Sequence, residues 1–525
     1  MKKFALLLAV NLALISGLRA ELKLPGVIGD HMVLQQKQAN PIWGWDTPGT
    51  KITVSFGGQS ISAQAGGDGK WSVKLPPMPA SSVPTALVVN GSSQTEIQDV
   101  LVGEVWLCSG QSNMEMGIGA VQDGTNEIAA ANFPNIRLLM VPNSWKPEPQ
   151  VDQAGAWKIC TPPNISQDGW KGFSAAAYFF GRELHRKLNV PIGLIDATWG
   201  GTRIESWTPP EGFAAVPALK ELHTALQTAD FHTAVHQQRL KQYLDDAEKW
   251  IPLARAAQSN QTAVPTMPAY PPELLPPHDL EDSTALYNGM IFPVHPFGIR
   301  GAIWYQGEAN NGEGMVYFEK MKALVGGWRQ IWGEENFPFY FVQIAPYDYG
   351  DNPENLSELW EAQATAAREI TNTGMAVVND IGDLKDIHPK NKQEVGRRLA
   401  LLALAKTYGH PEIICSGPTF QSMEIEGNTL RVRFANAEGG LVSRDGQPLN
   451  WFEIFDAHGT GFVTARAQID GASIVLSAPE VNHPVAMRFA WSHIAEPNLM
   501  NKASLPAGAF RAGTIQTPST TIKSR

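Results

Sequence analysis

The serine in the segment LCSGQSNMEM occupies a position where a nucleophile could act. It follows the apolar run VLVGEVWL, which is typical of a buried strand, and Gly110 interrupts the chain where a parallel strand would pass into a helix. A serine nucleophile needs a base that takes its proton and a carboxylate that orients the base. The segment DIHP contains both residue types. We therefore expect Ser112 as nucleophile, His388 as general base and Asp386 as the orienting carboxylate.

The spacing of Asp386 and His388 allows their side chains to meet. Pro389 disfavours helical backbone at His388, so an extended segment is expected. Residues two apart in an extended chain point to the same side and lie about 6.5–7 Å apart. Asp386 would then contact one ring nitrogen while the other faces Ser112. Asp383, which precedes the same histidine, is an alternative orienting residue.

Acyl transfer also requires hydrogen-bond donors for the oxyanion, each commonly worth about 100- to 1,000-fold in rate. The candidates are the backbone N–H groups of Ser112 and Gly201 and the side-chain amide of Gln306. A glycine at position 201 lets the backbone come close to a substrate.

Each of these residues has an ordinary structural explanation when taken alone. The sequence SNME matches the S-x-x-E capping box, so Ser112 could be a helix N-cap. His388 and Asp386 could be loop residues, and Gly200 and Gly201 could be turn glycines. These alternatives do not explain why all of them follow strands of one predicted sheet.

That sheet is predicted from the alternation of apolar strands and amphipathic helices between residues 100 and 410. The strand candidates are EVWLCS, PIGLIDATW, RGAIWYQG, FPFYFVQIAP and GMAVVNDIG. They predict a five-stranded, doubly wound parallel α/β sheet, in which ligands bind beyond the carboxyl ends of the strands. An insertion over residues 209–285 is helical in its first half and Pro-rich in its second. It is expected to form a helical flap and an extended strap near the site.

Two regions of short β segments flank this domain. Residues 21–99 have turn residues every eight to twelve positions, which predicts an antiparallel β-sandwich. Residues 411–525 return to the same pattern and are expected to form a second β region. Two to three domains suit a chain of 525 residues.

The first 20 residues have the pattern of a secretory signal peptide: two lysines, an apolar run and a small residue, Ala20. Cleavage after Ala20 and a periplasmic or extracellular location are expected. No later apolar run is long enough to predict a membrane span. The 41 basic and 51 acidic residues give a net charge of −10, which disfavours nucleic acid as a partner. The oligomeric state is open, and three cysteines (Cys108, Cys160 and Cys415) allow at most one internal disulfide.

Four ordered blocks resemble the conserved blocks of the sialate O-acetylesterases, a branch of the SGNH hydrolase superfamily: GEVWLCSGQSNMEM, ATWGGTRIESW, IWYQGEAN and DIHPKNKQEVGRRLA. Segments near the C-terminus, such as GGLVSRDGQPLNWFEI, resemble that family as well. The resemblance implies a flavodoxin-like SGNH core and a serine esterase without metal or organic cofactor that removes O-acetyl groups from sugars. It assigns the nucleophile to Ser112, the other triad members to Asp386 and His388, and oxyanion donors to Gly201 or Gly200 and to Gln306.

The substrate implied by the resemblance is 9-O-acetylated sialic acid, with acetylated plant polysaccharides such as xylan as the alternative. A sugar acid would favour an arginine in the cleft, and Arg203 is the candidate, although it could instead pair with Glu205 or Glu308. Glu308 is also expected to bind substrate. A carbohydrate-binding protein around an inactive esterase core is a further alternative. Three tryptophans near strand ends could stack on sugar rings, namely Trp199, Trp207 and Trp304.

Overall fold

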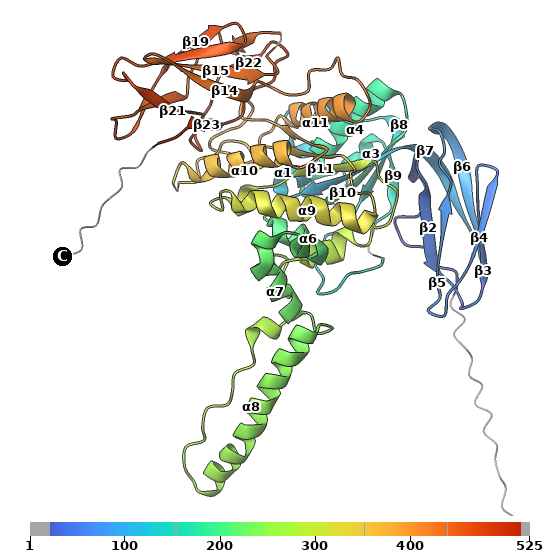
Figure 1. Cartoon of the computed structure of the whole chain (residues 1–525). Coiled ribbons are helices and arrows are strands. Elements are labelled where there is room, and N and C mark those ends of the chain that lie inside the picture. Colours follow the sequence, from blue (N-terminus) through green and yellow to red (C-terminus); the bar gives the residue numbers. More distant parts are fainter. Residues whose placement is uncertain (1–20, 153–154, 168, 351, 438, 516–525) are drawn as a thin grey trace, which may run out of the picture.

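The computed structural model describes residues 21–152, 155–167, 169–350, 352–437 and 439–515, so the expected signal segment lies outside the described residues. An N-terminal β region and a C-terminal β region lie at opposite sides of a central α/β domain (Figure 1). In the described part of the chain, no helix is long and apolar enough to cross a membrane.

The N-terminal region consists of short strands with alternating burial, as expected for a half-buried sheet. In β3 and β5 every second residue is buried. The strands are β1 (Val33–Gln35), β2 (Asn40–Trp45), β3 (Lys51–Phe56), β4 (Gln59–Gln64), β5 (Lys70–Leu75) and β6 (Ser81–Asn90). β2 pairs with β5, whereas β3 pairs with β4 and β6. All of these strands lie in segments that the sequence predicts to be β.

One long strand, β7 (Gln94–Gly110), joins the N-terminal region to the central sheet. Its first half pairs with β6, and its second half pairs with β10 and β11 of the central domain. The boundary expected at residue 99 therefore falls inside a continuous strand, and no linker separates the two regions.

The central sheet has the strand order β13-β12-β11-β7-β10-β8-β9. Its further members are β8 (Phe133–Met140), β9 (Trp157–Cys160), β10 (Ile192–Thr198), β11 (Gly301–Tyr305), β12 (Phe339–Val342) and β13 (Thr373–Ala376). All pairs are parallel except β8 with β9. The five predicted strands are adjacent in the order β10-β7-β11-β12-β13.

The prediction of five parallel strands is wrong by one, because β8 is a sixth. β8 escapes the sequence pattern since Pro134 and Arg137 interrupt its apolar run. Arg137 is nevertheless buried, and its guanidinium donates to the Asp99 carboxylate at 2.7 and 3.1 Å. The ion pair makes burial of the charged residue possible.

Helices cover both faces of the sheet (Figure 1), with α4 and α11 packed together on one face and α9 and α10 on the other. The helices are α1 (Ser112–Glu115), α2 (Gly124–Ala130), α3 (Pro162–Ile165), α4 (Ala175–Leu188), α5 (Ile204–Trp207), α6 (Pro210–Ala215), α7 (Lys220–Ala229), α8 (Ala234–Ser259), α9 (Val316–Trp332), α10 (Asn355–Glu369) and α11 (Lys392–Lys406). This two-sided cover explains why the central strands are apolar throughout.

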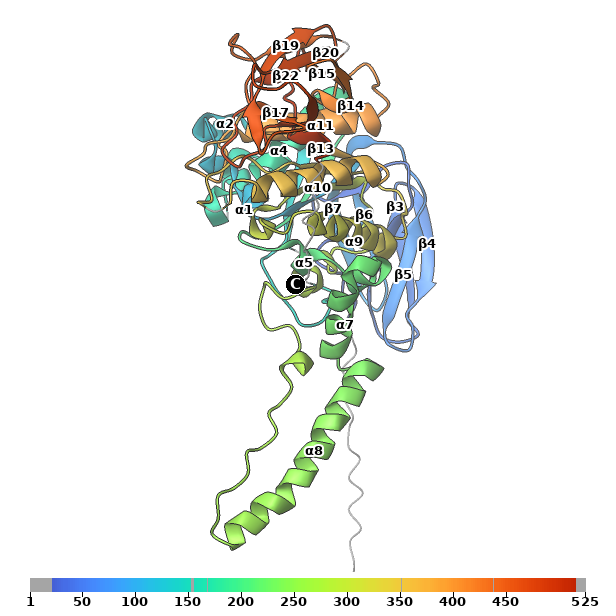
Figure 2. The same cartoon turned by 60° about the vertical axis from the view of Figure 1, so that its left-hand side comes forward.

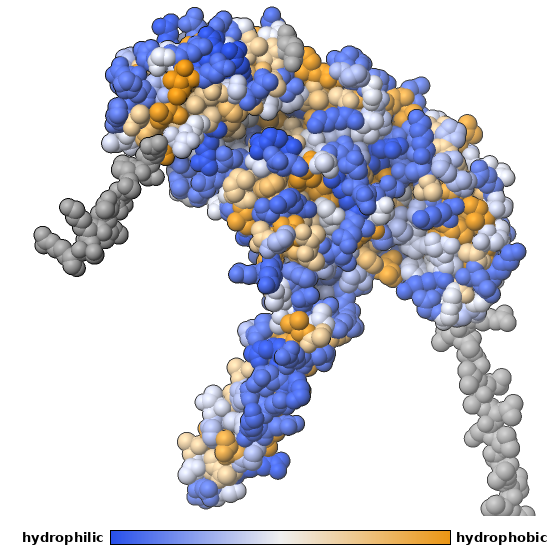
Figure 3. Space-filling view, in the orientation of Figure 1, coloured by the Kyte–Doolittle hydropathy of each residue, from blue (hydrophilic) through white to orange (hydrophobic). Residues whose placement is uncertain are grey.

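The insertion does not form the expected flap near the site. Its helix α8 and the segment that returns along it project away from the body as an arm (Figures 1 and 2). Trp250 of α8 donates to the Pro265 carbonyl of the returning segment at 2.8 Å. Apolar side chains such as Leu253 are exposed on the arm (Figure 3), so the helical pattern of α8 does not reflect burial against the domain.

The C-terminal region contains two four-stranded antiparallel sheets, β14-β15-β20-β19 and β18-β17-β21-β23, and a β16-β22 pair. Phe510 contacts both Phe434 and Phe489 and so joins the two larger sheets. The strands are β14 (Thr419–Glu426), β15 (Thr429–Ala435), β16 (Leu441–Ser443), β17 (Phe452–Asp456), β18 (Phe462–Thr464), β19 (Arg466–Asp470), β20 (Ser473–Ser477), β21 (Pro484–Phe489), β22 (Leu499–Asn501) and β23 (Phe510–Gly513).

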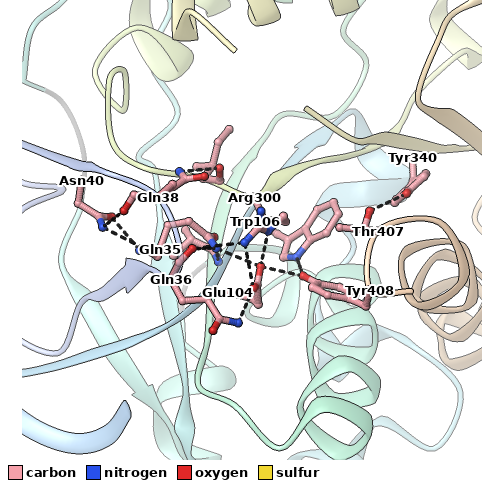
Figure 4. A network of polar contacts seen from close by, with 12 residues as sticks. Gln35, Gln36, Gln38, Asn40, Glu104, Trp106, Arg300, Tyr340, Thr407 and Tyr408 are labelled. Atoms are coloured by element: carbon pink, nitrogen blue, oxygen red, sulfur yellow. Dashed lines mark hydrogen bonds and ion pairs between the residues drawn. The ribbon is translucent and has the colours of Figure 1, made fainter. Parts of the chain in front are cut away.

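A buried carboxylate fastens the N-terminal region to the central domain (Figure 4). Glu104 of β7 accepts hydrogen bonds from Gln36 at 2.6 Å, from Arg300 at 2.7 Å and from Tyr408 at 2.9 Å. These partners lie after β1, before β11 and after α11, so one side chain connects three separate segments of the chain.

Replacing Glu104 with alanine is expected to lower the free energy of unfolding by about 3–5 kcal/mol, because it leaves Arg300 without its buried counter-charge. Chemical denaturation of the two proteins measures this loss. The exposed carboxylate of Glu369, which pairs with Arg368 on the surface, provides the matched control. Replacing Glu369 with alanine should lower the free energy of unfolding by about 0.5 kcal/mol or less. Equal losses in the two variants would contradict the role of Glu104 in joining the N-terminal region to the central domain.

Candidate active site

The carboxyl ends of the three central strands meet at one edge of the sheet. Gly110 ends β7 and is in register with Thr198 of β10 and with Tyr305 of β11. Gly110 has φ of +144°, and a Cβ there would lie 2.1 Å from the Tyr305 carbonyl oxygen. Only glycine fits this position, so the chain can turn sharply between β7 and α1 beside its neighbour strand.

Ser112 is the first residue of α1 and is not its N-cap. The N-cap is Gln111, whose side chain makes no capping bond and instead accepts from the backbone N–H groups of Gly307 and Ala309. The Ser112 hydroxyl lies 2.9 Å from Nε2 of His388. The capping-box alternative therefore does not describe this serine.

The loop that presents His388 is a turn rather than the expected extended segment. The Asp386 N–H donates to the Asp383 carbonyl, and one Asp386 carboxylate oxygen accepts the backbone N–H of His388 at 3.0 Å. This Asx-type turn is a common local conformation of aspartate. The same oxygen lies 3.5 Å from Nδ1 of His388, which is within the distance of an ion pair. Contacts between catalytic residues are often long without substrate and shorten when substrate binds.

Asp383 is placed differently from Asp386. Its carboxylate accepts the backbone N–H of Lys385 at 2.9 Å. Among the described residues it makes no ion pair with His388. The geometry thus favours Asp386 over Asp383 as the partner of the imidazole.

The charges around His388 keep its imidazole neutral and its partner ionised. Burial lowers the pKa of His388, and the positive charges of Lys392 and Lys390 add to this effect, whereas Asp386 opposes it. Burial alone would raise the pKa of Asp386, but the His388 N–H and the Lys390 ammonium lower it overall. A neutral imidazole beside an ionised carboxylate is the state that a general base requires.

Two backbone N–H groups near Ser112 are available for an oxyanion. The N–H groups of Ser112 and Gly201 donate to no acceptor in the described parts of the chain, and Gly201 is exposed with φ of +75°. The N–H of Gly200 is already used, because it donates to the Glu115 carboxylate at 2.7 Å. Gly201 is therefore better placed than Gly200 for this role.

Gln306 does not have the geometry expected of an oxyanion donor. Its side chain is completely buried, and its amide nitrogen donates to the Thr202 carbonyl at 3.2 Å and to Asn310 at 2.7 Å. Its amide oxygen accepts from Tyr317 at 2.8 Å. With both N–H groups committed, Gln306 supports the loops around the site rather than facing a substrate.

Arg203 and Glu308 are likewise occupied within the protein. Arg203 forms ion pairs with Glu313 and Glu205, and Glu205 also pairs with Lys320. Glu308 is buried, and one of its carboxylate oxygens accepts from the side chain of Asn113, whereas the other has no hydrogen-bond partner among the described residues. The alternative that Arg203 pairs with a neighbouring glutamate matches the structure in the case of Glu205.

A different tryptophan from those expected lies beside the histidine. Trp207 and Trp304 are fully buried in the core, and Trp199 is half-buried. Trp170 is 39% exposed, and its ring centre lies 4.9 Å from that of His388 in an edge-to-face arrangement. Its sequence context, GWKG, is polar and irregular, so nothing in the sequence pattern distinguishes it from a surface residue.

A cavity of about 390 Å³ lies beside α1, and Ser112, His388 and Trp170 are not among the residues that line it. Glu115 of α1 lines it together with Asp196, Asn143 and the glycines on either side of Trp170. Burial raises the pKa of Glu115, and it raises that of Asp196 to about 7, with the charge of Glu115 contributing. Lys158 also lines the cavity, so its wall carries both acidic and basic side chains.

The cysteines and the potential metal ligands are two further sets of residues that could do chemistry. Cys108, Cys160 and Cys415 are all free thiols. Within the described ranges, no group of three or more His, Cys, Asp or Glu side chains could hold a metal ion.

Comparison with known proteins places these features in a family. Residues 102–241 and 279–405 match the family model described as carbohydrate esterase, sialic acid-specific acetylesterase. The sialate O-acetylesterase of Rattus norvegicus is 30% identical over 434 residues, which cover 76% of each chain. That of Homo sapiens is 29% identical over 502 residues, covering 89% of this chain and 86% of the human one.

A solved structure agrees with these relatives. A carbohydrate acetylesterase from Xanthomonas citri is 34% identical and superposes with a TM-score of 0.77, covering 94% of this chain and all of the other. The family match includes Ser112 and His388 and omits most of the α8 arm. The chain therefore belongs to the sialic acid-specific acetylesterase family of carbohydrate esterases and is a carboxylic ester hydrolase.

Proposed function

We propose that Ser112, His388 and Asp386 form a catalytic triad that removes O-acetyl groups from sugars through an acetyl-enzyme intermediate. The observation that carries this proposal is the 2.9 Å contact between the Ser112 hydroxyl and Nε2 of His388. These residues are 276 positions apart in the chain, and both lie at the ligand-binding edge of the sheet.

In the first step the Ser112 oxygen attacks the acetyl carbonyl carbon while its proton passes to Nε2 of His388. The N–H groups of Ser112 and Gly201 donate to the resulting oxyanion. The bond between the carbonyl carbon and the sugar oxygen then breaks, and the sugar oxygen takes the proton from His388. In the second step His388 deprotonates a water molecule that attacks the acetyl-enzyme, and acetate leaves as Ser112 regains its proton.

The sugar is proposed to enter the cavity beside Glu115, with Trp170 as a stacking surface. Acetylated sialic acid is the first candidate substrate, since the relatives from rat and human are named sialate O-acetylesterases. A second candidate, an uncharged acetylated sugar such as those of xylan, is favoured by one observation. Arg203, the arginine expected to bind a sugar acid, is committed to ion pairs with Glu205 and Glu313.

Acetate release from O-acetylated sialic acid and from acetylated xylan oligosaccharides separates these candidates. The commitment of Arg203 to ion pairs predicts a kcat/KM at least about tenfold higher for the uncharged sugar, because the sialate carboxylate would lose its hydration without gaining an arginine partner. The reverse preference would reject the uncharged sugar. Release from neither, while an aryl acetate is hydrolysed, would exclude both substrates and leave the triad intact.

A further inference from the structure

The side chain next to the nucleophile connects the two halves of the site. Asn113 is completely buried, and its amide nitrogen donates to the Ile387 carbonyl at 2.9 Å and to the Glu308 carboxylate at 2.5 Å. Its amide oxygen accepts from Nζ of Lys392 at 2.5 Å. Ile387 directly precedes His388, and Lys392 begins the helix that follows the same loop. Asn113 thus joins the nucleophile turn to the histidine loop at two points.

The position of Lys392 is energetically unfavourable for a charged side chain. It is completely buried, which is rare for lysine, and it lies at the first position of α11, where the helix dipole disfavours a cation. Apart from Asn113, its ammonium group contacts the ring of Tyr305, whose centre is 4.8 Å away. Glu308 supplies the opposite charge nearby. A surface lysine would avoid these costs, so a role outside stability explains the residue better.

We propose that Lys392 is a positioning residue for deacetylation, which through Asn113 holds the turn of Ser112 against the loop of His388. This inference rests on the proposed triad. The two catalytic side chains come from distant parts of the chain and must stay within hydrogen-bond distance. A displacement of about 1 Å in such a site can cost 100-fold in rate.

The charge of Lys392 has a second, measurable consequence. The groups that face His388 are Asp386 and Lys390 from its own loop, Lys392 from α11, and Ser112 and Trp170, which are uncharged. Burial lowers the pKa of Lys392 to about 7, so its ammonium remains charged in the more acidic range where His388 titrates. Removing this positive charge should raise the pKa of His388. The acid limb of kcat/KM, which requires neutral His388, should therefore move to higher pH.

The test replaces Lys392 with methionine in the full chain and measures aryl acetate hydrolysis as a function of pH. We expect kcat to fall by about 10- to 100-fold, KM to change little, and the acid limb to move up by about half a pH unit. Lys406→Met is the matched control, because Lys406 lies in the last turn of the same helix and donates to the Thr373 carbonyl. Its pH profile should be that of the wild type.

Asn113→Ala provides an independent second variant, since it removes the connection and keeps the charge. It should lower kcat by a similar factor and leave the acid limb of kcat/KM in place. If Lys392→Met does not fold, Asn113→Ala still tests the inference. A wild-type kcat in Asn113→Ala would overturn the inference. A slower Lys392→Met enzyme with an unmoved acid limb would reduce Lys392 to a structural residue. Failure of the triad itself would show differently, as full activity in Ser112→Ala.

Discussion

Replacing Ser112 with alanine is expected to lower kcat for acetyl ester hydrolysis by about a million-fold and to leave the fold intact. The variant loses the only oxygen nucleophile that lies within hydrogen-bond distance of His388 among the described residues. Residual catalysis would come from the N–H groups at Ser112 and Gly201, which polarise the ester without forming the acyl-enzyme. Acetate release and thermal unfolding by circular dichroism measure activity and fold separately.

Ser109 supplies the matched control for this experiment. It lies on β7 three residues before Ser112, and its buried hydroxyl makes no hydrogen bond within the described part of the chain. Ser109→Ala should therefore keep wild-type activity. His388→Ala should lose about as much activity as Ser112→Ala, and the double variant little more, because the two residues act as a unit. A Ser112→Ala protein with a tenth of the wild-type rate would refute the assignment.

The carboxylate of Asp386, beside His388, is expected to have a large effect on kcat. Asp386→Asn is expected to lower kcat by about ten thousand-fold, whereas Asp383→Asn should change it less than about threefold. The asparagine still offers an oxygen to the backbone N–H of His388, so the turn is kept. The substitution removes the negative charge that stabilises the protonated imidazole and with it the ion pair to Lys390 at 3.0 Å. Pre-steady-state measurement of acylation gives the effect on the chemical step.

The contrast between the two aspartates distinguishes their roles. Asp383 contacts the backbone of Lys385 rather than the imidazole, and it is exposed. Equal losses in the two variants would mean that the loop as a whole, and not the carboxylate of Asp386, supports His388. A loss confined to Asp383→Asn would make that residue the orienting partner instead.

The sequence predicts those parts of the site that depend on local pattern. An apolar strand followed by Gly110 and Ser112 indicates a sharp turn at a strand end, and the structure has that turn. The five predicted strands are present because buried parallel strands are apolar throughout. β8 is missed because Arg137 is stabilised by Asp99, a partner on another strand that the pattern of β8 itself does not include.

The remaining parts depend on contacts between segments far apart in the chain. The amide of Gln306 is used by Thr202 and Asn310, and no spacing rule predicts this. Trp170 approaches His388 only after its irregular loop has folded onto the site. The sequence around Lys392 indicates an ordinary solvent-exposed lysine at the start of a helix. In each case the deciding factor is a tertiary contact, which a single sequence does not contain.

The arm formed by α8 shows a related limit. Its helical spacing is correct, but the same amphipathic pattern is compatible with packing on the domain and with projection from it. The exposed apolar side chains along the arm show that the second arrangement is present (Figure 3). Periodicity therefore predicted the helix but not its position.

Covalent labelling with a fluorophosphonate identifies the nucleophile, which we propose to be Ser112. Such a reagent reacts with an activated serine regardless of which step limits turnover. We expect one adduct on the peptide that contains Ser112, with activity lost in proportion to labelling and no labelling in His388→Ala. Complete inactivation with the adduct on another residue, or full activity after Ser112 is labelled, would contradict it.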